Sequence, residues 1–174
     1  GSERIGYANS NAKILENAYY ILTPTDVIST DKIEAYTDLI TQMHAIPLQL
    51  TFEEHDFVTA AISHLPHVIS ASLVNLVKDS DSDKGTMKAI AAGGFKDITR
   101  ISSSSPVMWQ NICLTNKENI LKLLEKYMIS LEEIKDRIAA SDEQEIYDFF
   151  DTARNYRASF IEANSGPIKK AYTL

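Results

Sequence analysis

The spacing of apolar side chains changes near residue 50, and the change separates two kinds of predicted element. Residues 18–25 (AYYILTPT) are aromatic and β-branched and end in a proline turn, which is typical of a short buried strand. Apolar side chains then recur at helical spacing at Ile33, Tyr36, Leu39, Ile40 and Met43. Residues 44–50 (HAIPLQL) predict a second strand. Strand, helix and strand over residues 1–50 are typical of the end of an α/β domain.

From residue 51 onward the pattern predicts helices. Four pairs fit the reciprocal capping box, in which a hydroxyl and an acidic or amide side chain satisfy backbone N–H groups at a helix start. These pairs are Thr51/Glu54, Thr115/Glu118, Ser130/Glu133 and Ser141/Gln144. Between Phe57 and Val77 apolar residues cover nearly every side, which indicates a helix buried in a core or by a partner subunit. The predicted fold is therefore mainly α, with a multi-helix domain after a short β-α-β segment.

Composition narrows the class of protein. A chain of 174 residues with 44% hydrophobic content is long enough for one sizeable core. Its net charge of −7, with no Lys/Arg run longer than two, argues against nucleic acid as a partner. Apolar runs are interrupted before the roughly 20 residues of a membrane span, and no signal pattern begins the chain. We expect a cytoplasmic protein that does not contact a membrane, with Cys113, the single cysteine, as a packed thiol.

His64 and His67 are the first candidates for chemistry. A helix turns about 100° per residue, so residues three apart lie about 60° apart and could address one ligand. His55, nine residues before His64, falls on the opposite side, although Pro66 tends to kink the helix and loosens this argument. Neither Glu-x-x-His nor His-Glu-x-x-His spacing occurs, so we expect no metal site. Buried, hydrogen-bonded histidines without a ligand remain the alternative.

Residues 93–109 (GGFKDITRISSSSPVMW) hold the second candidate. Arg100 lies in a stretch with hydroxyls but few charges, which suggests recognition of a carboxylate or phosphate by its planar donor fork. An ion pair with Asp97, one helical turn earlier, is an equal alternative. Pro106 is expected at the first position of a helix after Ser105. Trp109, the only tryptophan, is typical of a core or an interface.

Four separated segments together resemble the prephenate dehydrogenase family over nearly the whole chain. In order they are GSERIG, ENAYYILTPT, EEHDFVTAAISHLPHVISASL and GGFKDITRISSSSPVMW. The resemblance implies that residues 1–50 are the end of a Rossmann-type nucleotide-binding domain. It also implies that residues 51–163 form a helical dimerisation and substrate domain, of the type found at the C-terminus of 6-phosphogluconate dehydrogenase. Residues 164–174 would be a linker toward a regulatory ACT-type domain.

The resemblance also implies an activity. The family converts prephenate to 4-hydroxyphenylpyruvate by oxidative decarboxylation with NAD or NADP, a step of tyrosine biosynthesis. No glycine-rich loop follows a strand here, so the full-length enzyme would bind the cofactor elsewhere, and none is expected to bind this chain tightly. The family's catalytic histidine is expected four residues before Gly1. We therefore expect no catalytic residue in this chain and no activity from it alone.

Site roles carry over residue by residue from this resemblance. The residues expected to contact substrate are His64, His67, Arg100, Glu3 and Ser2, with Arg100 holding a substrate carboxylate. The residues expected to support them are His55, Asp97 and Trp109. The expected partners are a second copy of the chain, prephenate, and tyrosine as an inhibitor. Two alternatives stay open: a pure dimerisation module whose histidines serve packing, and an arogenate dehydrogenase or other β-hydroxyacid dehydrogenase-like enzyme.

Overall fold

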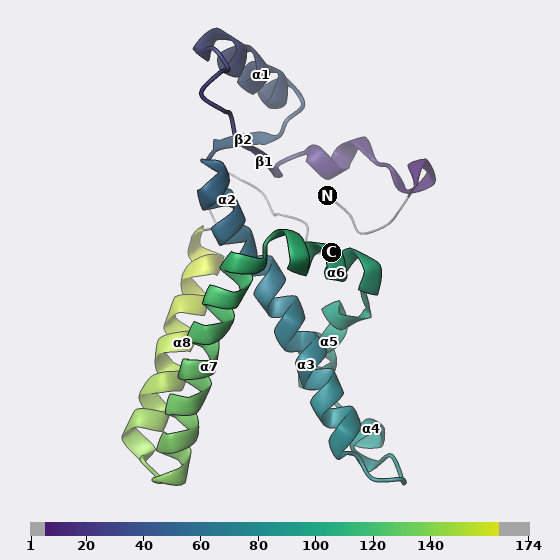
Figure 1. Ribbon diagram of the computed structural model, residues 1–174, viewed down its shortest axis with the longest axis vertical. Helices are drawn as coiled ribbons and strands as arrows, with labels where there is room; N and C mark the ends of the chain where they lie inside the picture. Colours follow the sequence, from purple (N-terminus) through teal and green to yellow (C-terminus); the bar gives the residue numbers. More distant parts are fainter. Residues whose placement is uncertain (1–5, 164–174) are drawn as a thin grey trace. The chain divides into compact units, whose positions relative to one another are not determined.

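The computed structural model describes residues 6–163, which divide into two compact units. The first unit takes in the chain up to Phe52 and again from Ile129, and the second comprises Glu53–Met128. Ser2, Glu3 and the expected linker at residues 164–174 lie outside the described residues. Helices dominate both units, as the apolar pattern predicted, and the described strands form one small sheet. Figure 1 shows these elements along the chain.

The strand, helix and strand predicted near the N-terminus are present in the first unit. Two 3-10 turns, η1 (Tyr7–Asn9) and η2 (Ala12–Leu15), precede β1 (Tyr19–Leu22), α1 (Thr30–Gln42) and β2 (Ile46–Gln49). The strands are parallel, with Tyr19 opposite Ile46, and α1 is the crossover that a parallel pair requires.

One face of this sheet packs on α1, where Tyr20 meets Tyr36 with ring centroids 6.3 Å apart. Ile40 of α1 is fully buried. Side chains alternate between the two faces of a strand, so Tyr19 and Ile21 point to the other face, where both are exposed. The prediction of a buried strand is thus wrong for this face, because α1 covers only the opposite side within the described residues.

The first unit also holds the end of α7 (Lys117–Ala139) and all of α8 (Glu143–Ala163). Asp142, and not Ser141, caps α8, because its Oδ1 accepts from the Glu145 N–H at 3.1 Å. The start predicted at Ser130 is wrong, since Ser130 lies inside α7. The half-buried face formed by Tyr127 and Ile134 continues past it. A cavity of about 630 Å³ opens between α7 and α8 and is lined by Arg137, Glu145 and Phe149 among others.

The second unit is built on one continuous helix, made of α2 (Phe52–Thr59), η3 (Ala60–His64) and α3 (Leu65–Ser80). The middle segment η3 is π-helical, and the N–H of Leu65 donates to the carbonyl of Ala60 five residues earlier. Pro66 explains this wider turn, because it has no N–H for the ordinary bond to Ile62. A π turn absorbs the mismatch without ending the helix. Ala60 of this helix and Ile120 of α7 are buried.

By length and composition this helix, Phe52–Ser80, could cross a membrane, with a mean hydropathy of 1.5 in its most apolar window. Our expectation that apolar runs end too early is therefore wrong for this helix, because Ser63, His64 and His67 interrupt it without adding an Asp, Glu, Lys or Arg. Core helices of water-soluble proteins share this length and composition. Only 11% of the window is buried within the chain. The apolar surface of this helix therefore needs another covering.

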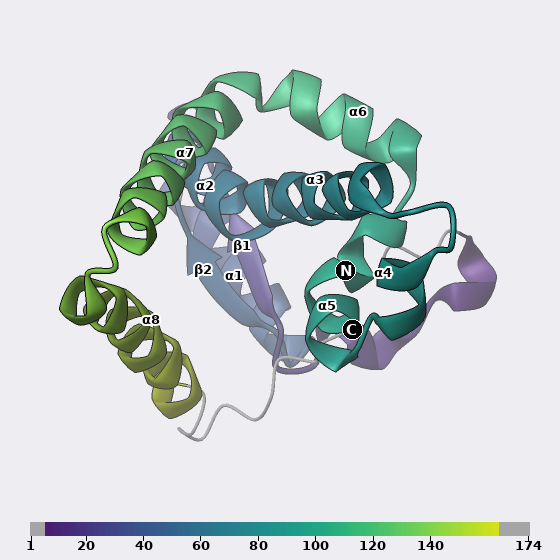
Figure 2. The ribbon, with the colours of Figure 1, turned by 90° about the horizontal axis from the view of Figure 1, so that it is seen from below.

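The remaining elements of the second unit flank α3. They are α4 (Thr86–Ile90), α5 (Gly93–Thr99), η4 (Arg100–Ser103) and α6 (Pro106–Thr115). Figures 1 and 2 both show α5 and α6 beside α3. As predicted, Pro106 opens α6, and the Ser105 hydroxyl accepts from the Met108 N–H at 3.5 Å.

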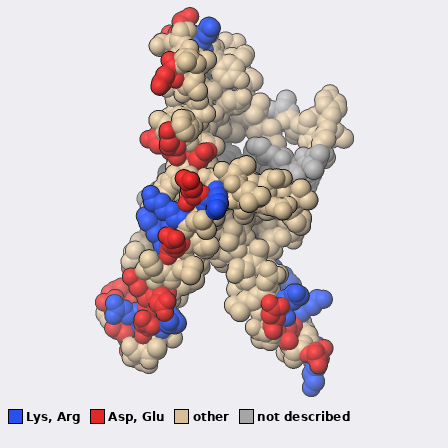
Figure 3. All heavy atoms as spheres, in the orientation of Figure 1, with Lys and Arg blue, Asp and Glu red and all other residues tan. Residues whose placement is uncertain are grey.

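Thr115 lies at the end of α6, and Asp81 directly follows the end of α3. Thr115 closes α6, where its hydroxyl donates to the Asn111 carbonyl at 2.9 Å, so the capping box predicted there is wrong. Asp81 caps α4 by accepting from the N–H groups of Met87 and Lys88 at 2.9 and 3.1 Å. Gly85 takes the left-handed conformation just before α4, with φ of 64°. In Figure 3 Lys, Asp and Glu side chains gather around α4 and over α2 and α7, and the body of α3 in view is largely uncharged.

Candidate functional site

Three aromatic rings from α3, η3 and α6 meet in the second unit. The imidazole of His67 stacks on the indole of Trp109, with centroids 3.7 Å apart and an interplanar angle of 25°. His64 contacts the same indole edge-on, at 6.1 Å and 76°. The structure therefore brings His64, His67 and Trp109 together, and the two imidazoles contact one indole ring. We call His64, His67 and Trp109 the ring cluster.

Hydrogen bonding assigns the proton of His67. Its Nδ1 lies 2.8 Å from the carbonyl oxygen of Ser63, one turn earlier. A carbonyl only accepts, so Nδ1 carries the proton and donates. In the neutral ring Nε2 then holds a lone pair. The indole Nε1 of Trp109 is buried without a hydrogen-bond partner within residues 6–163.

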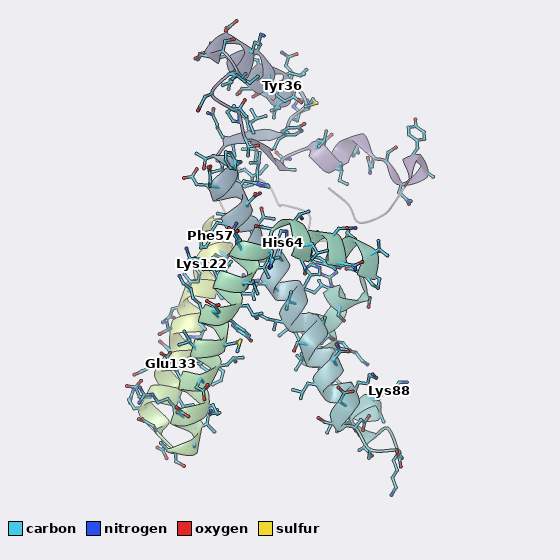
Figure 4. The ribbon with its side chains drawn as sticks, in the orientation of Figure 1. Tyr36, Phe57, His64, Lys88, Lys122 and Glu133 are labelled. Carbon is cyan, nitrogen blue, oxygen red and sulfur yellow. The ribbon has the colours of Figure 1, made fainter. Side chains whose placement is uncertain are left out.

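His64 is half-buried and lies where η3 ends, close to the junction of α6 and α7 (Figure 4). Its Nδ1 lies 3.3 Å from Nδ2 of Asn116, which also donates to the carbonyl of Asp56 at 2.7 Å. Burial lowers the pKa of His64 below its usual 6.5, and repulsion from His67 lowers it further. Asp56 raises this pKa and His55 lowers it, both by weaker effects. His64 is therefore neutral at pH 7.

His55 is held by its own helix, apart from the ring cluster. Its Nδ1 lies 3.0 Å from the Asp56 carboxylate, and its Nε2 lies 3.5 Å from the hydroxyl of Thr59. On the facing side of α2, Phe57 packs beneath the ammonium of Lys122 from α7 at 5.7 Å (Figure 4). No three His, Cys, Asp or Glu side chains among the described residues could together hold a metal ion.

A cavity of about 710 Å³ lies against the ring cluster. Its lining includes His67, Trp109 and the half-buried Cys113. The polar residues that line it are uncharged: Ser72, Asn75, Ser102, Ser104 and Gln110. Neither His64 nor Arg100 belongs to this lining. The cavity by itself therefore offers hydrogen bonds and apolar contact, and no fixed charge for an anion.

Arg100 begins η4, and its neighbour Ile101 lines the cavity. Arg100 is exposed, and so is Asp97. The described residues hold no ion pair between them, so the alternative reading of Arg100 as the partner of Asp97 is not realised here. The structure does not bring Arg100 into contact with His64 or His67. Ser2 and Glu3 lie outside the described residues.

Comparison with known proteins decides the family. Residues 51–152, more than half of the chain, match the family described as "Prephenate dehydrogenase, dimerization domain". The chain belongs to the prephenate dehydrogenase family.

Prephenate dehydrogenase relatives resemble the chain over its whole length. The prephenate dehydrogenase of Bacillus subtilis (strain 168) is 37% identical over 174 residues, which is 100% of this chain and 47% of that protein. The cyclohexadienyl dehydrogenase of Zymomonas mobilis (strain ATCC 31821 / ZM4 / CP4) is 29% identical over 90% of this chain and 54% of that protein. The chain thus spans about half the length of the curated relatives it matches.

A solved prephenate dehydrogenase shares the fold. The crystal structure of the A. aeolicus enzyme in complex with hydroxyphenyl propionate and NAD+ matches with a TM-score of 0.86 and 30% sequence identity. The match covers 92% of this chain and 56% of that one. The mainly helical architecture inferred from the apolar pattern is therefore confirmed as the prephenate dehydrogenase fold.

Two residues of this prephenate dehydrogenase family member escaped the sequence reasoning. Asn116 bonds His64 from 52 positions away, and the carbonyl of Asp56 holds the same amide. The sequence predicted a helix start next to Asn116, at Thr115/Glu118, but did not single out Asn116. Its contact with His64 was not, because no periodicity relates residues so far apart.

Proposed function

We propose that this chain forms the dimerisation and substrate-binding part of a cytoplasmic prephenate dehydrogenase. Such an enzyme converts prephenate to 4-hydroxyphenylpyruvate, with loss of carbon dioxide and reduction of NAD or NADP, in tyrosine biosynthesis. The family match over residues 51–152 supports the reaction class. The observation that carries the substrate assignment is the ring cluster, in which two imidazoles share one indole face and edge.

The chemistry of prephenate suits these side chains. Prephenate carries a six-membered ring, a hydroxyl group and two carboxylates. An indole and two imidazoles supply flat apolar surface for a ring together with hydrogen-bonding nitrogens at its edge. The exposed guanidinium of Arg100 would hold one carboxylate through two parallel hydrogen bonds, and the family resemblance gives Asp97 a supporting role and Glu3 and Ser2 a substrate contact. The A. aeolicus relative, solved with hydroxyphenyl propionate, supports a ligand with one ring and one carboxylate.

The strand-to-helix turn that the structure describes lacks the glycines of a dinucleotide site. Binding its pyrophosphate requires a glycine-rich turn between a strand and a helix, where the backbone can approach closely. Residues 23–29 (TPTDVIS), which follow β1, contain no glycine. We therefore assign to this chain the binding and orientation of substrate, and no part of hydride transfer.

The exposed apolar helix supports a homodimer as the assembly. Ile62 is 75% exposed and Leu76 is 62% exposed, and both belong to the continuous helix Phe52–Ser80. Large apolar side chains in such number on one helix need a covering surface. A second copy of the chain is the occupant we propose, because the matching family is a dimerization domain. A symmetric pair would bury the same helix from each protomer.

Thermal unfolding of the purified chain tests substrate binding directly. A ligand that binds only the folded state raises the melting temperature in proportion to the logarithm of its concentration. We expect prephenate to raise it, and tyrosine to compete with prephenate in the same assay. A parallel titration with arogenate reports whether the site prefers the amino acid side chain over the keto acid. A melting temperature that stays constant up to saturating prephenate contradicts the assignment.

One observation favours a second function, a dimerisation module whose histidines only pack. Each imidazole of the cluster already has a hydrogen bond within the chain, to Ser63 for His67 and to Asn116 for His64. If packing is their role, His64→Gln and His67→Gln change the melting temperature and leave no separate effect on prephenate binding. If they contact substrate, the same variants weaken prephenate binding by more than their effect on stability explains.

A further inference from the structure

Asn116 lies between α6 and α7 with an amide whose orientation is settled by its neighbours. One side-chain atom lies 2.7 Å from the backbone carbonyl of Asp56. Because that carbonyl can only accept, the facing atom is the NH₂ group and not the oxygen. The amide oxygen on the other side accepts from Nδ2 of Asn119 at 2.8 Å. The carbonyl of Asp56 therefore fixes the orientation of the amide, and the contact with Asn119 is compatible with it.

This orientation leaves one N–H of Asn116 for His64. An NH₂ group has two hydrogens, and the first is taken by Asp56. The second points to Nδ1 of His64, with the two nitrogens 3.3 Å apart. An amide N–H only donates, so Nδ1 of His64 must present its lone pair. The ring proton is then on Nε2.

We propose that Asn116 is a positioning residue that holds His64 as the neutral tautomer with its proton on Nε2. His64 thereby presents a hydrogen-bond donor to a ligand oxygen, such as a hydroxyl or carboxylate. This role in ligand recognition rests on the proposed function, whereas the tautomer itself does not. Asn116 acts through His64 and does not itself touch the ligand.

His67 supplies a contrast within the same cluster. Its Nδ1 donates to the carbonyl of Ser63 at 2.8 Å, so it holds the opposite tautomer, with a lone pair on Nε2. Two histidines three residues apart therefore differ in hydrogen-bonding role although both contact Trp109.

The groups around His64 all bear on its charge. Burial and the rings of His67 and His55 disfavour the protonated form, and the Asp56 carboxylate favours it. Asn116 adds a further barrier, since a proton on Nδ1 would face the amide N–H at hydrogen-bond distance. Replacing that N–H by an acceptor reverses this contribution and leaves the others in place.

Nitrogen-15 NMR of the histidine rings in the full chain tests the proposal without any ligand. The chemical shifts and two-bond couplings to the carbon-bound protons distinguish a protonated nitrogen from one with a lone pair, and His64→Gln assigns the signals. We expect an unprotonated Nδ1 and protonated Nε2 for His64, and the reverse for His67. A protonated Nδ1 on His64 in the unaltered chain overturns the proposal.

Asn116→Asp provides the second measurement, because it replaces the amide by a group of the same shape that accepts. We expect the proton of His64 to move to Nδ1 and its NMR titration midpoint to rise by roughly one to three pH units. Asn116→Leu, which removes both donors, is expected to leave a mixture of tautomers. The matched control is Asn111→Asp, whose amide donates to the Val107 carbonyl on the same helix α6. An unchanged His64 spectrum in Asn116→Asp contradicts the proposal.

Prephenate binding, measured by calorimetry on the same samples, separates this inference from the proposed function. If the chain shows the expected tautomers and does not bind prephenate, the positioning role of Asn116 holds and the substrate assignment fails. If prephenate binds and His64 has its proton on Nδ1, only the inference about Asn116 fails. With both correct, Asn116→Leu weakens binding about tenfold, through loss of one oriented hydrogen bond.

Discussion

The imidazole of His67 lies nearly parallel to the indole of Trp109, with the two ring centroids 3.7 Å apart. This stack joins α3 to α6 at the level where η3 ends and where the cavity begins. Trp109 therefore has two roles. It holds α6 against the continuous helix, and it shapes the candidate site. Substitutions that keep or remove its ring can separate the two.

Removal of the Trp109 ring is expected to destabilise the second unit. We expect Trp109→Ala to lower the free energy of unfolding by about 2 to 4 kcal/mol, because it deletes a large half-buried ring and its stacking contact with His67. Trp109→Phe keeps a flat ring beside His67 and should retain most of that stability. Urea unfolding followed by circular dichroism measures both variants. Equal stability of Trp109→Ala and the unaltered chain would show that the stack contributes nothing.

The depressed pKa of His64 predicts a pH dependence of stability. The unfolded chain takes up a proton near pH 6.5, whereas the folded ring resists protonation because it is buried and lies near His67. This contribution to stability is present above the unfolded value and is lost as the pH falls through the folded one. We expect the free energy of unfolding to decrease from neutral to mildly acidic pH.

Urea titrations across that range measure the effect, and His64→Gln should flatten the slope. His44→Gln changes an exposed histidine and is the control, in which the slope of stability with pH should stay as in the unaltered chain. A slope that persists in His64→Gln assigns the pH dependence to other groups.

Arg100 is predicted to matter for binding and not for folding. It is exposed and forms no ion pair with Asp97, so Arg100→Gln should leave the melting temperature unchanged within about 1 °C. Loss of a charge-assisted carboxylate contact should weaken prephenate binding roughly 10- to 100-fold. Calorimetry measures the affinity. Arg157→Gln, on α8, removes the same charge as a matched control and should bind normally. Unchanged affinity in Arg100→Gln would remove Arg100 from the site.

Asp81 is predicted to hold α4 in its helical conformation. Its carboxylate accepts from the N–H groups of Met87 and Lys88, and these bonds lower its pKa. Asp81→Ala should therefore speed hydrogen exchange at both amides at neutral pH, with Asp83→Ala in the same loop as the control. In the unaltered chain this protection is present at neutral pH and is lost as the pH falls through the lowered pKa. Slow exchange in Asp81→Ala would assign the stability of α4 to its packing.

Charges on the continuous helix are predicted to separate the dimer. Ile62→Asp combined with Leu76→Asp places two carboxylates on exposed apolar positions, and desolvating them between protomers is costly. We expect a dimer for the unaltered chain and a monomer for the double variant, measured by sedimentation equilibrium. Val27→Asp, at a side chain 88% exposed in the loop between β1 and α1, should remain dimeric. A monomeric unaltered chain at micromolar concentration contradicts the proposed homodimer.

The local elements were predictable because they depend on neighbours in sequence. The aromatic and β-branched residues 18–25 and the helical spacing of Ile33 to Met43 correctly indicated β1 and α1. The capping boxes were less reliable. Thr51 correctly preceded α2, but Ser130 lies inside a helix and Asp142 took the place of Ser141. A hydroxyl three residues before an acidic side chain also occurs inside helices, so the motif indicates a helix start only where the apolar pattern breaks.

The sequence by itself determined the order of elements, the apolar helix around His64 and His67, and the resemblance to prephenate dehydrogenases. It also placed those two histidines on one side of a helix. Only the tertiary structure decided that Trp109 contacts both histidines and that Asn116 bonds His64 across 52 positions. It also decided that Arg100 forms no ion pair with Asp97 among the described residues. Periodicity encodes which side of a helix is apolar. The partner that covers that side, and the atom it offers to an imidazole, depend on how the chain returns in space.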